Sequence, residues 1–318
     1  MRAPALGAFE HEAFLYAGAS AFIDGTVPFI QAGLEADEPV LVVVAADKIA
    51  ELRRALGDDA HRVSFADMAH VGRNPARIIP AWRDFLAQNA GRPPARGIGE
   101  PVWAGRTPDE LAECQRHEAL LNVAFASGAP WRLLCPYDTQ SLGPDVLQEA
   151  RHSHRFVTSG LDIDECADYQ GDDWPGSGDL DLPEPPGPVA ALRFGAGPLE
   201  PVRRFVIDEV AAALGPVELI DLLQAVTEVA ANSLVHAGGS GALRLWTTGT
   251  GVVCEVRDDG WVREPLVGRA RPSVEKEGGR GLWMVNQLCD LVQLRSSPAG
   301  TVVRMHMHQR GAEPAANL

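Results

Sequence analysis

Four short motifs in the last third of the chain constrain its fold more than any other feature. Glu228 and Asn232 share a predicted helix, residues 258–260 (Asp-Asp-Gly) follow a predicted strand, residues 279–281 (Gly-Arg-Gly) open another helix, and Thr301 precedes the last strand. Each motif puts polar side chains or bare backbone within reach of a ligand. A fold that uses all four must bring two helices and two strands together around one cleft.

The helix predicted over Pro216–Ala237 carries a polar pair on an otherwise apolar side. Glu228 and Asn232 are four residues apart in the sequence and therefore lie on one face, beside Val229. An amide oxygen is a good ligand for Mg²⁺, and a nearby carboxylate can accept a proton from an attacking hydroxyl. The alternative is a polar stripe on the helix surface, and the pair alone does not decide between the two.

The other motifs suit a nucleotide as well. Asp258, at a strand end and backed by Gly260, can accept a hydrogen bond from an adenine amino group, although such residues also form ordinary turns. Residues 278–282 open a helix whose free N–H groups suit phosphates, and the alternative is a flexible loop with a glycine-rich cap. The hydroxyl of Thr301 can reach adenine through a water molecule.

Together the motifs resemble the ATP-binding domain that histidine kinases, gyrases and the anti-sigma serine kinases share. The resemblance covers about Leu199–His308, and V-T-E-V-A-A-N-S-L-V-H-A and G-R-G-L-W-M-V are most similar to the anti-sigma branch. It implies a two-layer α/β sandwich of the histidine-kinase-like ATPase type. The implied roles are Mg²⁺ binding by Asn232, base catalysis by Glu228, adenine recognition by Asp258, and nucleotide binding by Gly260, Gly279, Arg280, Gly281, Leu282 and Thr301.

His236 and Val262 lie close to these motifs. His236 follows Asn232 by four residues, which puts it near the phosphates, or else it simply caps the helix end. The family's first glycine motif reads D-x-G-x-G, and here Val262 replaces the second glycine. A β-branched residue does not readily adopt a positive φ, so the replacement puts the loop geometry and the nucleotide affinity in question. The lid between Val262 and Gly278 is short, which suits a small anti-sigma domain.

The first 160 residues alternate strand-like and helix-like patterns, which predicts an α/β domain with a parallel sheet and helices on both faces. The apolar run Pro39–Ala45 predicts a strand buried on both sides, and Thr107–Phe125 a long helix with a capping Thr and an early Pro. Asp47 is expected to cap a helix, and residues 136–138 to turn the chain after a strand.

Several stretches of this region resemble the MEDS sensory domain, a RecA-like α/β module of bacterial and archaeal regulators. They are H-E-A-F-L-Y, F-I-Q-A-G-L-E-A-D-E-P-V-L-V, G-I-G-E-P-V-W and C-P-Y-D. The resemblance implies sensing of a small organic signal. Glu100, Trp103, Tyr137 and Asp138 fall near predicted strand ends, where open parallel sheets bind ligands, so they are our ligand candidates. In the alternative, Trp103 belongs to the core and Asp138 caps a helix.

The sequence predicts four segments: a sensory domain (1–160), an acidic linker (161–191), an ATPase domain (192–310) and a disordered tail (311–318). From Asp162 to Glu184 there are nine acidic residues and no basic one, interspersed with Gly and Pro. Such a segment does not bury enough apolar surface to order itself. The alternative is an acidic docking peptide.

Charge and cysteine content limit the environment and the partners. With 28 Lys and Arg against 43 Asp and Glu, the formal net charge is −15, which argues against direct nucleic-acid binding. Five cysteines, an odd number without a C-x-x-C pair, fit a reducing cytoplasm. We see neither a signal peptide nor an apolar run long enough to span a bilayer, so we expect a cytoplasmic protein outside the membrane.

These features favour a signal-responsive anti-sigma regulator of transcription. With ATP and Mg²⁺, its C-terminal domain is expected to bind a sigma factor, or to phosphorylate a serine of an anti-anti-sigma protein as a serine/threonine protein kinase. A sensor histidine kinase is one alternative, because Arg116–Asn122 contains H-E-x-L-x-N around His117, although a surface histidine on a helix is the simpler interpretation. A non-catalytic binding module is another, and the oligomeric state, monomer or homodimer, stays open.

Overall fold

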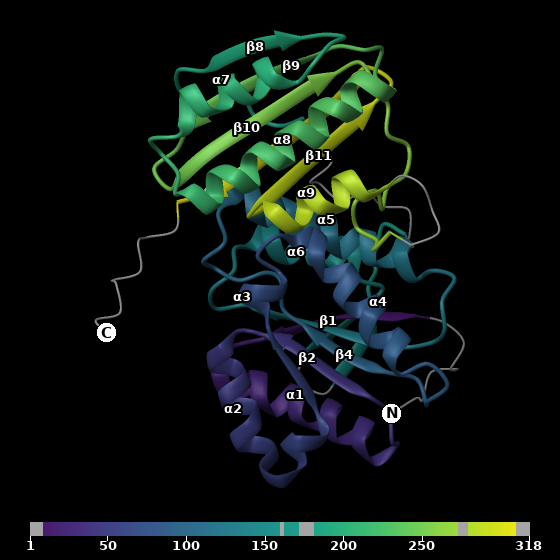
Figure 1. Ribbon diagram of the computed structural model, residues 1–318. Coiled ribbons are helices and arrows are strands. Elements are labelled where there is room, and N and C mark those ends of the chain that lie inside the picture. The colour runs from purple at the N-terminus through teal and green to yellow at the C-terminus, as the bar shows by residue number, and fades with distance from the viewer. Residues whose placement is uncertain (1–8, 160–161, 172–180, 273–278, 310–318) are drawn as a thin grey trace. The chain divides into compact units, whose positions relative to one another are not determined.

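The computed structural model describes residues 9–159, 162–171, 181–272 and 279–309. Contacts divide the chain into two units, Met1–Asp179 and Leu180–Leu318 (Figure 1). The predicted tail 311–318 and part of the predicted linker lie outside the described residues. Among the helices that the structure describes, none is long and apolar enough to cross a lipid bilayer.

A largely parallel sheet forms the centre of the first unit. Its strand order is β3-β2-β4-β5-β1-β6-β7, with β7 antiparallel to β6 and the other neighbours parallel. The strands are β1 (Glu10–Tyr16), β2 (Val40–Val44), β3 (Ser64–Asp67), β4 (Arg96–Gly99), β5 (Arg132–Asp138), β6 (Phe156–Ser159) and β7 (Asp162–Glu165). All of β2 is buried, which is expected where helices cover both faces of a sheet.

Helices lie on both faces of this sheet, with α1 and α2 on one face and α4, α5 and α6 on the other (Figure 1). They are α1 (Gly18–Glu35), α2 (Ala46–Leu56), α3 (Met68–Val71), α4 (Ile78–Gln88), α5 (Pro108–Phe125) and α6 (Pro144–Ser153), with short 3₁₀ turns at Gly57–Arg62 and Pro75–Arg77. The predicted cap of α5 is confirmed: Thr107 and Glu110 exchange hydrogen bonds between side chain and backbone.

Two local predictions for the first unit are wrong. Asp47 does not cap α2, because the helix already begins at Ala46 and the carboxylate only accepts a hydrogen bond from the N–H of Lys48. Residues 136–138 do not turn the chain but continue β5, which stays paired with β1 up to Asp138. Since β4 pairs with β5 only as far as Leu134, the missing N–H of Pro136 interrupts no ladder on that side.

The second unit is a two-layer sandwich of one antiparallel sheet and three helices on one of its faces (Figure 1). The sheet order is β11-β12-β10-β9-β8. The elements are β8 (Ala190–Phe194), α7 (Glu200–Val210), α8 (Pro216–His236), β9 (Gly241–Thr247), β10 (Gly251–Asp258), α9 (Arg280–Leu288), β11 (Leu291–Ser297) and β12 (Gly300–His308). Apolar residues of α8, including Leu222, Val226 and Ala230, fill the core between the layers. Only β8 was not predicted among these described elements.

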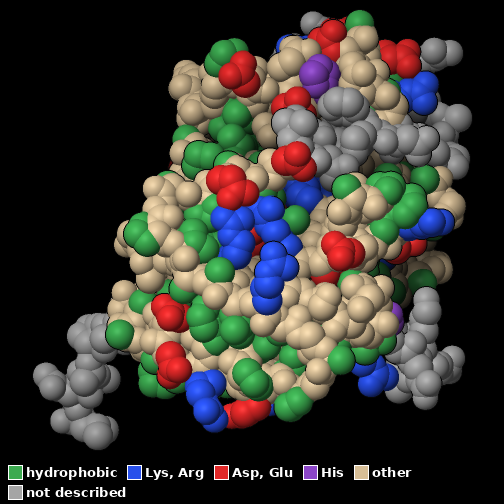
Figure 2. All heavy atoms as spheres, turned by 90° about the horizontal axis from the view of Figure 1, so that it is seen from above, with side chains coloured by type: hydrophobic (Ala, Val, Ile, Leu, Met, Phe, Trp, Pro, Cys, Tyr) green, Lys and Arg blue, Asp and Glu red, His purple; other side chains and the backbone are tan. Residues whose placement is uncertain are grey.

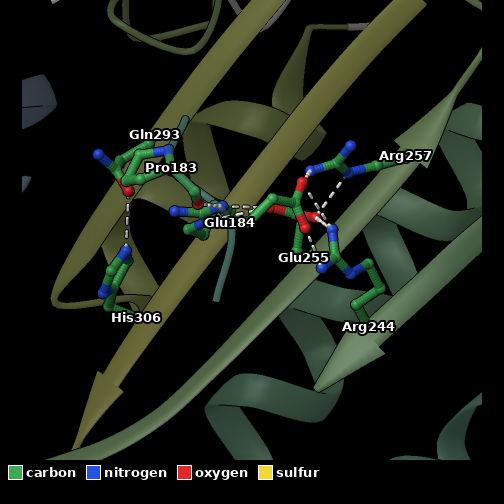
Figure 3. Close-up of polar contacts among 8 residues, drawn as sticks. Pro183, Glu184, Arg244, Glu255, Arg257, Gln293 and His306 are labelled. Atoms are coloured by element: carbon green, nitrogen blue, oxygen red, sulfur yellow. Dashed lines mark hydrogen bonds and ion pairs between the residues drawn. The ribbon is translucent and has the colours of Figure 1, made fainter. Parts of the chain in front are cut away.

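The acidic segment that the sequence assigns to a linker is ordered in part. β7 extends the first sheet, and Glu184 bridges two arginines of the second unit. Nη2 of Arg244 donates to Glu184 at 2.6 Å, and Nη2 of Arg257 donates to it at 3.1 Å (Figure 3). Composition missed these contacts because the arginines lie 60 and 73 residues further along the chain.

Acidic and basic side chains are interspersed on the face of the molecule that Figure 2 shows. This pattern accompanies a formal net charge of −15 for the whole chain. The expectation that the protein does not bind nucleic acid directly stays a prediction, since one face does not test it.

Candidate functional site

A cavity of about 380 Å³ lies in the second unit, at the helix-covered side of the sheet. Side chains and backbone from all four sequence motifs line it: Asn232, His236, Asp258, Gly260, Gly279, Gly281, Leu282 and Thr301. Its apolar walls include Val229, Val267 and Leu294. The fold thus brings α8, the start of α9 and the adjoining ends of β10 and β12 around one space, as the motif order predicts.

Hydrogen bonds fix the carboxylate of Asp258 at the end of β10. The buried hydroxyl of Ser233 donates to its Oδ2 at 2.6 Å, and the N–H of Gly260 donates to Oδ1 at 2.9 Å. A carboxylate can accept about four hydrogen bonds, so capacity for an amino group remains. The sequence missed Ser233, whose only signal is its position beside Asn232 on α8.

A chain of hydrogen bonds holds the loop after Asp258 against β11 and β12. The N–H of Val262 donates to Oγ of Ser296 at 2.7 Å, Ser296 and Thr301 share a hydroxyl contact of 2.6 Å, and Thr301 donates to the carbonyl of Gly260 at 2.8 Å. Among the described residues, Asp37 is the only non-glycine with a positive φ. Val262 therefore lines the cavity without the backbone strain expected from the sequence.

The first turn of α9 approaches the polar pair of α8 closely. A Cβ atom at Gly281 would lie 3.0 Å from Oε2 of Glu228 and 3.3 Å from Nδ2 of Asn232, so only glycine fits there without displacement. Gly279 has a φ of 78°, in the left-handed region that glycine favours. Neither Glu228 nor Asn232 makes a side-chain hydrogen bond to another residue in the described part of the chain. An amide and a carboxylate beside a glycine-lined helix start fit Mg²⁺ and phosphate oxygens.

Of the two remaining candidates for nucleotide binding, His236 lines the cavity and Arg280 does not. His236, the last residue of α8, lines the cavity, which favours its predicted place near the ligand over a capping role, since Ala237 is the capping residue. Arg280 is exposed at the start of α9 and is not part of the described lining. The predicted lid lies partly at 273–278, outside the described residues.

In the first unit, the predicted ligand residue Glu100 is buried in a polar cluster at the end of β4. Lys48 donates to both of its carboxylate oxygens at 2.6 and 2.7 Å, and the hydroxyl of Tyr16 donates at 2.7 Å. Burial raises the pKa of Glu100 even though Lys48 and Tyr16 oppose this. Burial likewise raises the pKa of Tyr16. No sequence motif marks Lys48 as part of a site. Tyr16 is marked only as the last residue of the MEDS-like stretch H-E-A-F-L-Y.

The other three ligand candidates do not all join Glu100. Asp138 accepts hydrogen bonds from the N–H groups of Gly18 and Gln140, and these bonds lower its pKa although partial burial opposes them. The ring of Trp103 lies under the guanidinium of Arg106, 3.8 Å away. Tyr137 is buried and packs its ring edge-on against His154, 5.7 Å between centroids, which places it beside a different polar cluster.

That second cluster consists of His11, Glu118, Cys135 and His154, all buried. Burial, with His154 alongside, lowers the pKa of His11 to about 4. No motif in the sequence marks these four residues as a site, although His11 and Cys135 stand in two of the MEDS-like stretches.

His117, considered above as a phospho-acceptor or a surface histidine, is neither exposed nor at the surface. It lies on α5 with 1% of its side chain accessible. Because the ring is buried, a phosphoryl donor does not reach it in this structure. The expectation of a surface position is wrong, and the burial weakens the histidine-kinase alternative.

Two family models match the chain. Residues 10–155 match the MEDS model, described as the MEthanogen/methylotroph, DcmR Sensory domain, and residues 196–307 match the histidine kinase-like ATPase domain. A comparison with curated proteins found no match. The matched segments agree with both resemblances seen in the sequence. The chain therefore joins an N-terminal MEDS sensory domain to a C-terminal histidine kinase-like ATPase domain, an arrangement that indicates a signalling regulator.

Proposed function

We propose that the chain is a cytoplasmic, signal-responsive anti-sigma regulator whose C-terminal domain binds ATP with Mg²⁺. The observation that carries this proposal is the single cavity in which Asp258, Asn232 and the start of α9 meet. Their chemistry fits the base, the metal and the phosphates of a magnesium nucleotide, respectively.

Within this proposal each residue has a separate task. Asp258, oriented by Ser233, accepts a hydrogen bond from the base, and the amide oxygen of Asn232 is a metal ligand. The N–H groups at the start of α9 bind phosphate oxygens, which the absence of a side chain at Gly281 permits. Bound Mg²⁺ supplies charge neutralisation for the phosphates.

The proposed kinase activity depends on Glu228. Its carboxylate lies beside Gly281, next to the proposed phosphate position, and has no side-chain hydrogen bond among the described residues. It is therefore available to accept the proton of a serine hydroxyl on an anti-anti-sigma partner. The anti-sigma-like sequences of α8 and α9 support a sigma factor or its antagonist as the partner. The MEDS domain supports regulation by a signal.

Calorimetry with ATP, with and without Mg²⁺, tests the binding step. We expect Mg²⁺-dependent binding by the native chain and its loss in Asp258→Asn. The matched control is Asp259→Asn, an exposed carboxylate one residue further on, which we expect to bind normally. Equal binding by the two variants would remove the adenine role of Asp258.

Transfer of label from γ-labelled ATP tests the kinase step. The expected result is serine-bound label on an anti-anti-sigma partner, lost in Glu228→Gln while nucleotide binding persists. Nucleotide binding without transfer by the native chain would leave a non-catalytic switch. Capture of partners from native cells tests the regulatory role, and eluates without sigma factors or their antagonists would contradict it.

A further inference from the structure

Four metal-ligating side chains from separate elements meet inside the first unit. His11 lies on β1, Glu118 on α5, Cys135 on β5, and His154 directly after α6. None of these residues is more than 4% exposed, and one ligand atom from each lies within 4.8 Å of all the others. This cluster plays no part in the nucleotide site, which is formed by the second unit.

Four of the six separations between the ligand atoms lie at 3.0–3.4 Å, close to the edges of a coordination tetrahedron, and all six are within 4.8 Å. Oε2 of Glu118 lies 3.0 Å from Nε2 of His11 and 3.4 Å from Nε2 of His154. Sγ of Cys135 lies 3.4 Å from Oε2 of Glu118 and 3.4 Å from Nε2 of His11. Tetrahedral zinc with ordinary bond lengths to nitrogen, oxygen and sulfur places its ligand atoms about 3.3–3.6 Å apart.

The hydrogen bonds behind the two imidazoles determine which nitrogen carries the proton. Nδ2 of Asn122 donates to the carbonyl of Ser153 at 2.8 Å, so its Oδ1 faces Nδ1 of His11 at 3.0 Å and accepts the proton there. Nδ1 of His154 donates to the carbonyl of Ala150 at 2.7 Å. Both histidines therefore present an unprotonated Nε2 to the cluster, the arrangement in which histidines bind metals.

Without a cation, the lone pairs of several hydrogen-bond acceptors in this cluster face one another. The two Nε2 lone pairs face Oε2 of Glu118, which is itself an acceptor, and the one thiol hydrogen of Cys135 cannot serve all three atoms. Within the described residues, Nε2 of His154 and Oε1 of Glu118 have no hydrogen-bond partner. Buried acceptors that oppose one another are costly, so the geometry calls for a positive centre among them.

We propose that His11, Glu118, Cys135 and His154 bind one divalent transition-metal ion of the zinc class. Two nitrogens, one sulfur and one carboxylate oxygen are a donor set that suits zinc and excludes Ca²⁺ and Mg²⁺, which prefer oxygen. Cys135 binds as the thiolate and releases its proton to solvent as the metal enters. Four buried protein ligands leave no open position, so the ion ties β1, β5, α5 and α6 together and is not a catalytic centre.

Metal analysis of the full chain tests the proposal. We expect about one zinc per chain after dialysis against metal-free buffer, and much less in Cys135→Ser. The matched control is Cys114→Ser on α5, a second buried thiol of the same unit that donates to the carbonyl of Pro101 and should keep its zinc. Equal zinc in the two variants, or none in the native chain, would overturn the assignment.

Cobalt substitution gives a readout that needs no variant. Chelated native chain, refilled with Co²⁺ in the absence of nucleotide, should show the near-ultraviolet band of a cobalt–thiolate bond and strong visible bands of tetrahedral cobalt. Added zinc should abolish both. A cobalt complex without the thiolate band would contradict ligation by Cys135, even if Cys135→Ser itself fails to fold.

Asn122 is the positioning residue for His11 in this proposal. Asn122→Ala removes the acceptor that fixes the proton on Nδ1, and such changes behind a metal ligand weaken metal affinity about 10–100-fold. The cobalt–thiolate band should persist at saturating Co²⁺, since all four ligands remain. Unchanged affinity in this variant would contradict the proton assignment on which the site depends.

Discussion

On one side of the C-terminal sheet, Glu255 is wholly buried and both of its carboxylate oxygens are bound. Arg244 and Arg257 contact Oε1 at 3.1 and 2.6 Å (Figure 3). Arg304 contacts Oε2 at 2.7 Å. On the side that α8 and α9 cover, Glu228 and Asn232 make no side-chain hydrogen bond to a described residue and lie next to the cavity. A saturated polar group stabilises the fold, whereas an unsaturated one is available to a ligand.

The first unit repeats this difference. Glu100 is saturated by Lys48 and Tyr16, as Glu255 is by its arginines. Glu118 instead faces two imidazole nitrogens that have no proton to donate to it. The comparison predicts that changes at Glu255 or around Glu100 lower stability, and that changes next to Glu228 lower ligand affinity with little effect on stability.

The largest effect is expected at Glu255. Glu255→Gln keeps the shape of the side chain but leaves the buried guanidinium of Arg304 without its counter-charge, and removing one partner of a buried ion pair typically costs about 3–5 kcal/mol of unfolding free energy. Denaturant unfolding of the full chain, followed by a probe in the second unit such as Trp246, measures it.

Glu184→Gln is the matched control for Glu255. Glu184 binds two of the same arginines, yet 68% of its side chain is exposed, so water replaces the lost contacts. We expect a far smaller change in the denaturation midpoint than for Glu255→Gln. Similar losses of unfolding stability in the two variants would show that burial does not determine what each glutamate contributes, and would contradict the comparison.

A smaller loss of stability is expected for Lys48→Met. It leaves the buried carboxylate of Glu100 with only Tyr16 as a partner, at a cost of about 2 kcal/mol. The control is Arg54→Met, which removes an exposed cation from the same helix α2. Thermal unfolding of the first unit measures both, and equal shifts would mean that Lys48 acts only through general charge.

The stability lost in Lys48→Met is expected to depend on pH, because the carboxyl of Glu100 titrates. Burial raises the pKa of Glu100 above its ordinary 4.5, so the folded state binds the proton more tightly than the unfolded state does. This contribution is fully present below pH 4.5 and is lost as the pH rises through the folded pKa. Removing Lys48 raises that pKa further, so the variant should lose more stability at high pH than the native chain.

The sequence predicts the second unit better than the first, because its candidate site residues stand in short motifs at element ends. Spacing alone places Glu228 and Asn232 on one face, and glycines mark the close approach at Gly281. The family motif predicted strain at Val262, but the backbone there has no positive φ. A motif shows which residue is common at a position and does not show which φ the loop adopts. Ser233 and Ser296 were missed because serines that fix a carboxylate or a loop leave no spacing signal.

In the first unit the alternation of patterns predicts the parallel sheet but not its polar clusters. His11 and Cys135 are more than 120 residues apart in the sequence and meet only because β1 and β5 pair in parallel. Which strands become neighbours is decided by the whole topology, so no local pattern shows that Glu118 and His154 join them. The ordered part of the acidic segment was missed for the same reason, since its partners are distant arginines.

Gly281→Ala tests the ligand side of the comparison, with an effect near 1.4 kcal/mol. The added Cβ would lie 3.0 Å from Oε2 of Glu228, so the helix start or the carboxylate must shift. We expect Mg²⁺–ATP affinity to fall about 10-fold by calorimetry, with the unfolding midpoint nearly unchanged. Gly249→Ala is the control, because a Cβ there meets no atom within 4 Å. Normal affinity in Gly281→Ala would remove the helix start from the binding site.

The smallest effect is expected where the family pattern predicts a large one, at Val262. Val262→Gly restores D-x-G-x-G, and if valine strained the loop, this change would tighten nucleotide binding. The structure predicts otherwise: Val262 has no positive φ, and its N–H already bonds Ser296, a contact that glycine would keep but not improve. Affinity should therefore stay within about two-fold of the native value by calorimetry.

Gly260→Ala supplies the contrast for Val262→Gly within the same loop. A Cβ at Gly260 would lie 2.9 Å from Cβ of Ala237 and 3.0 Å from Oδ1 of Asp258, so contacts in this structure require the first glycine of the motif. We expect weaker nucleotide binding in Gly260→Ala beside unchanged binding in Val262→Gly. A several-fold gain in Val262→Gly would instead show that the loop is held in a conformation that costs affinity, and that the hydrogen bonds through Ser296 and Thr301 fix it there.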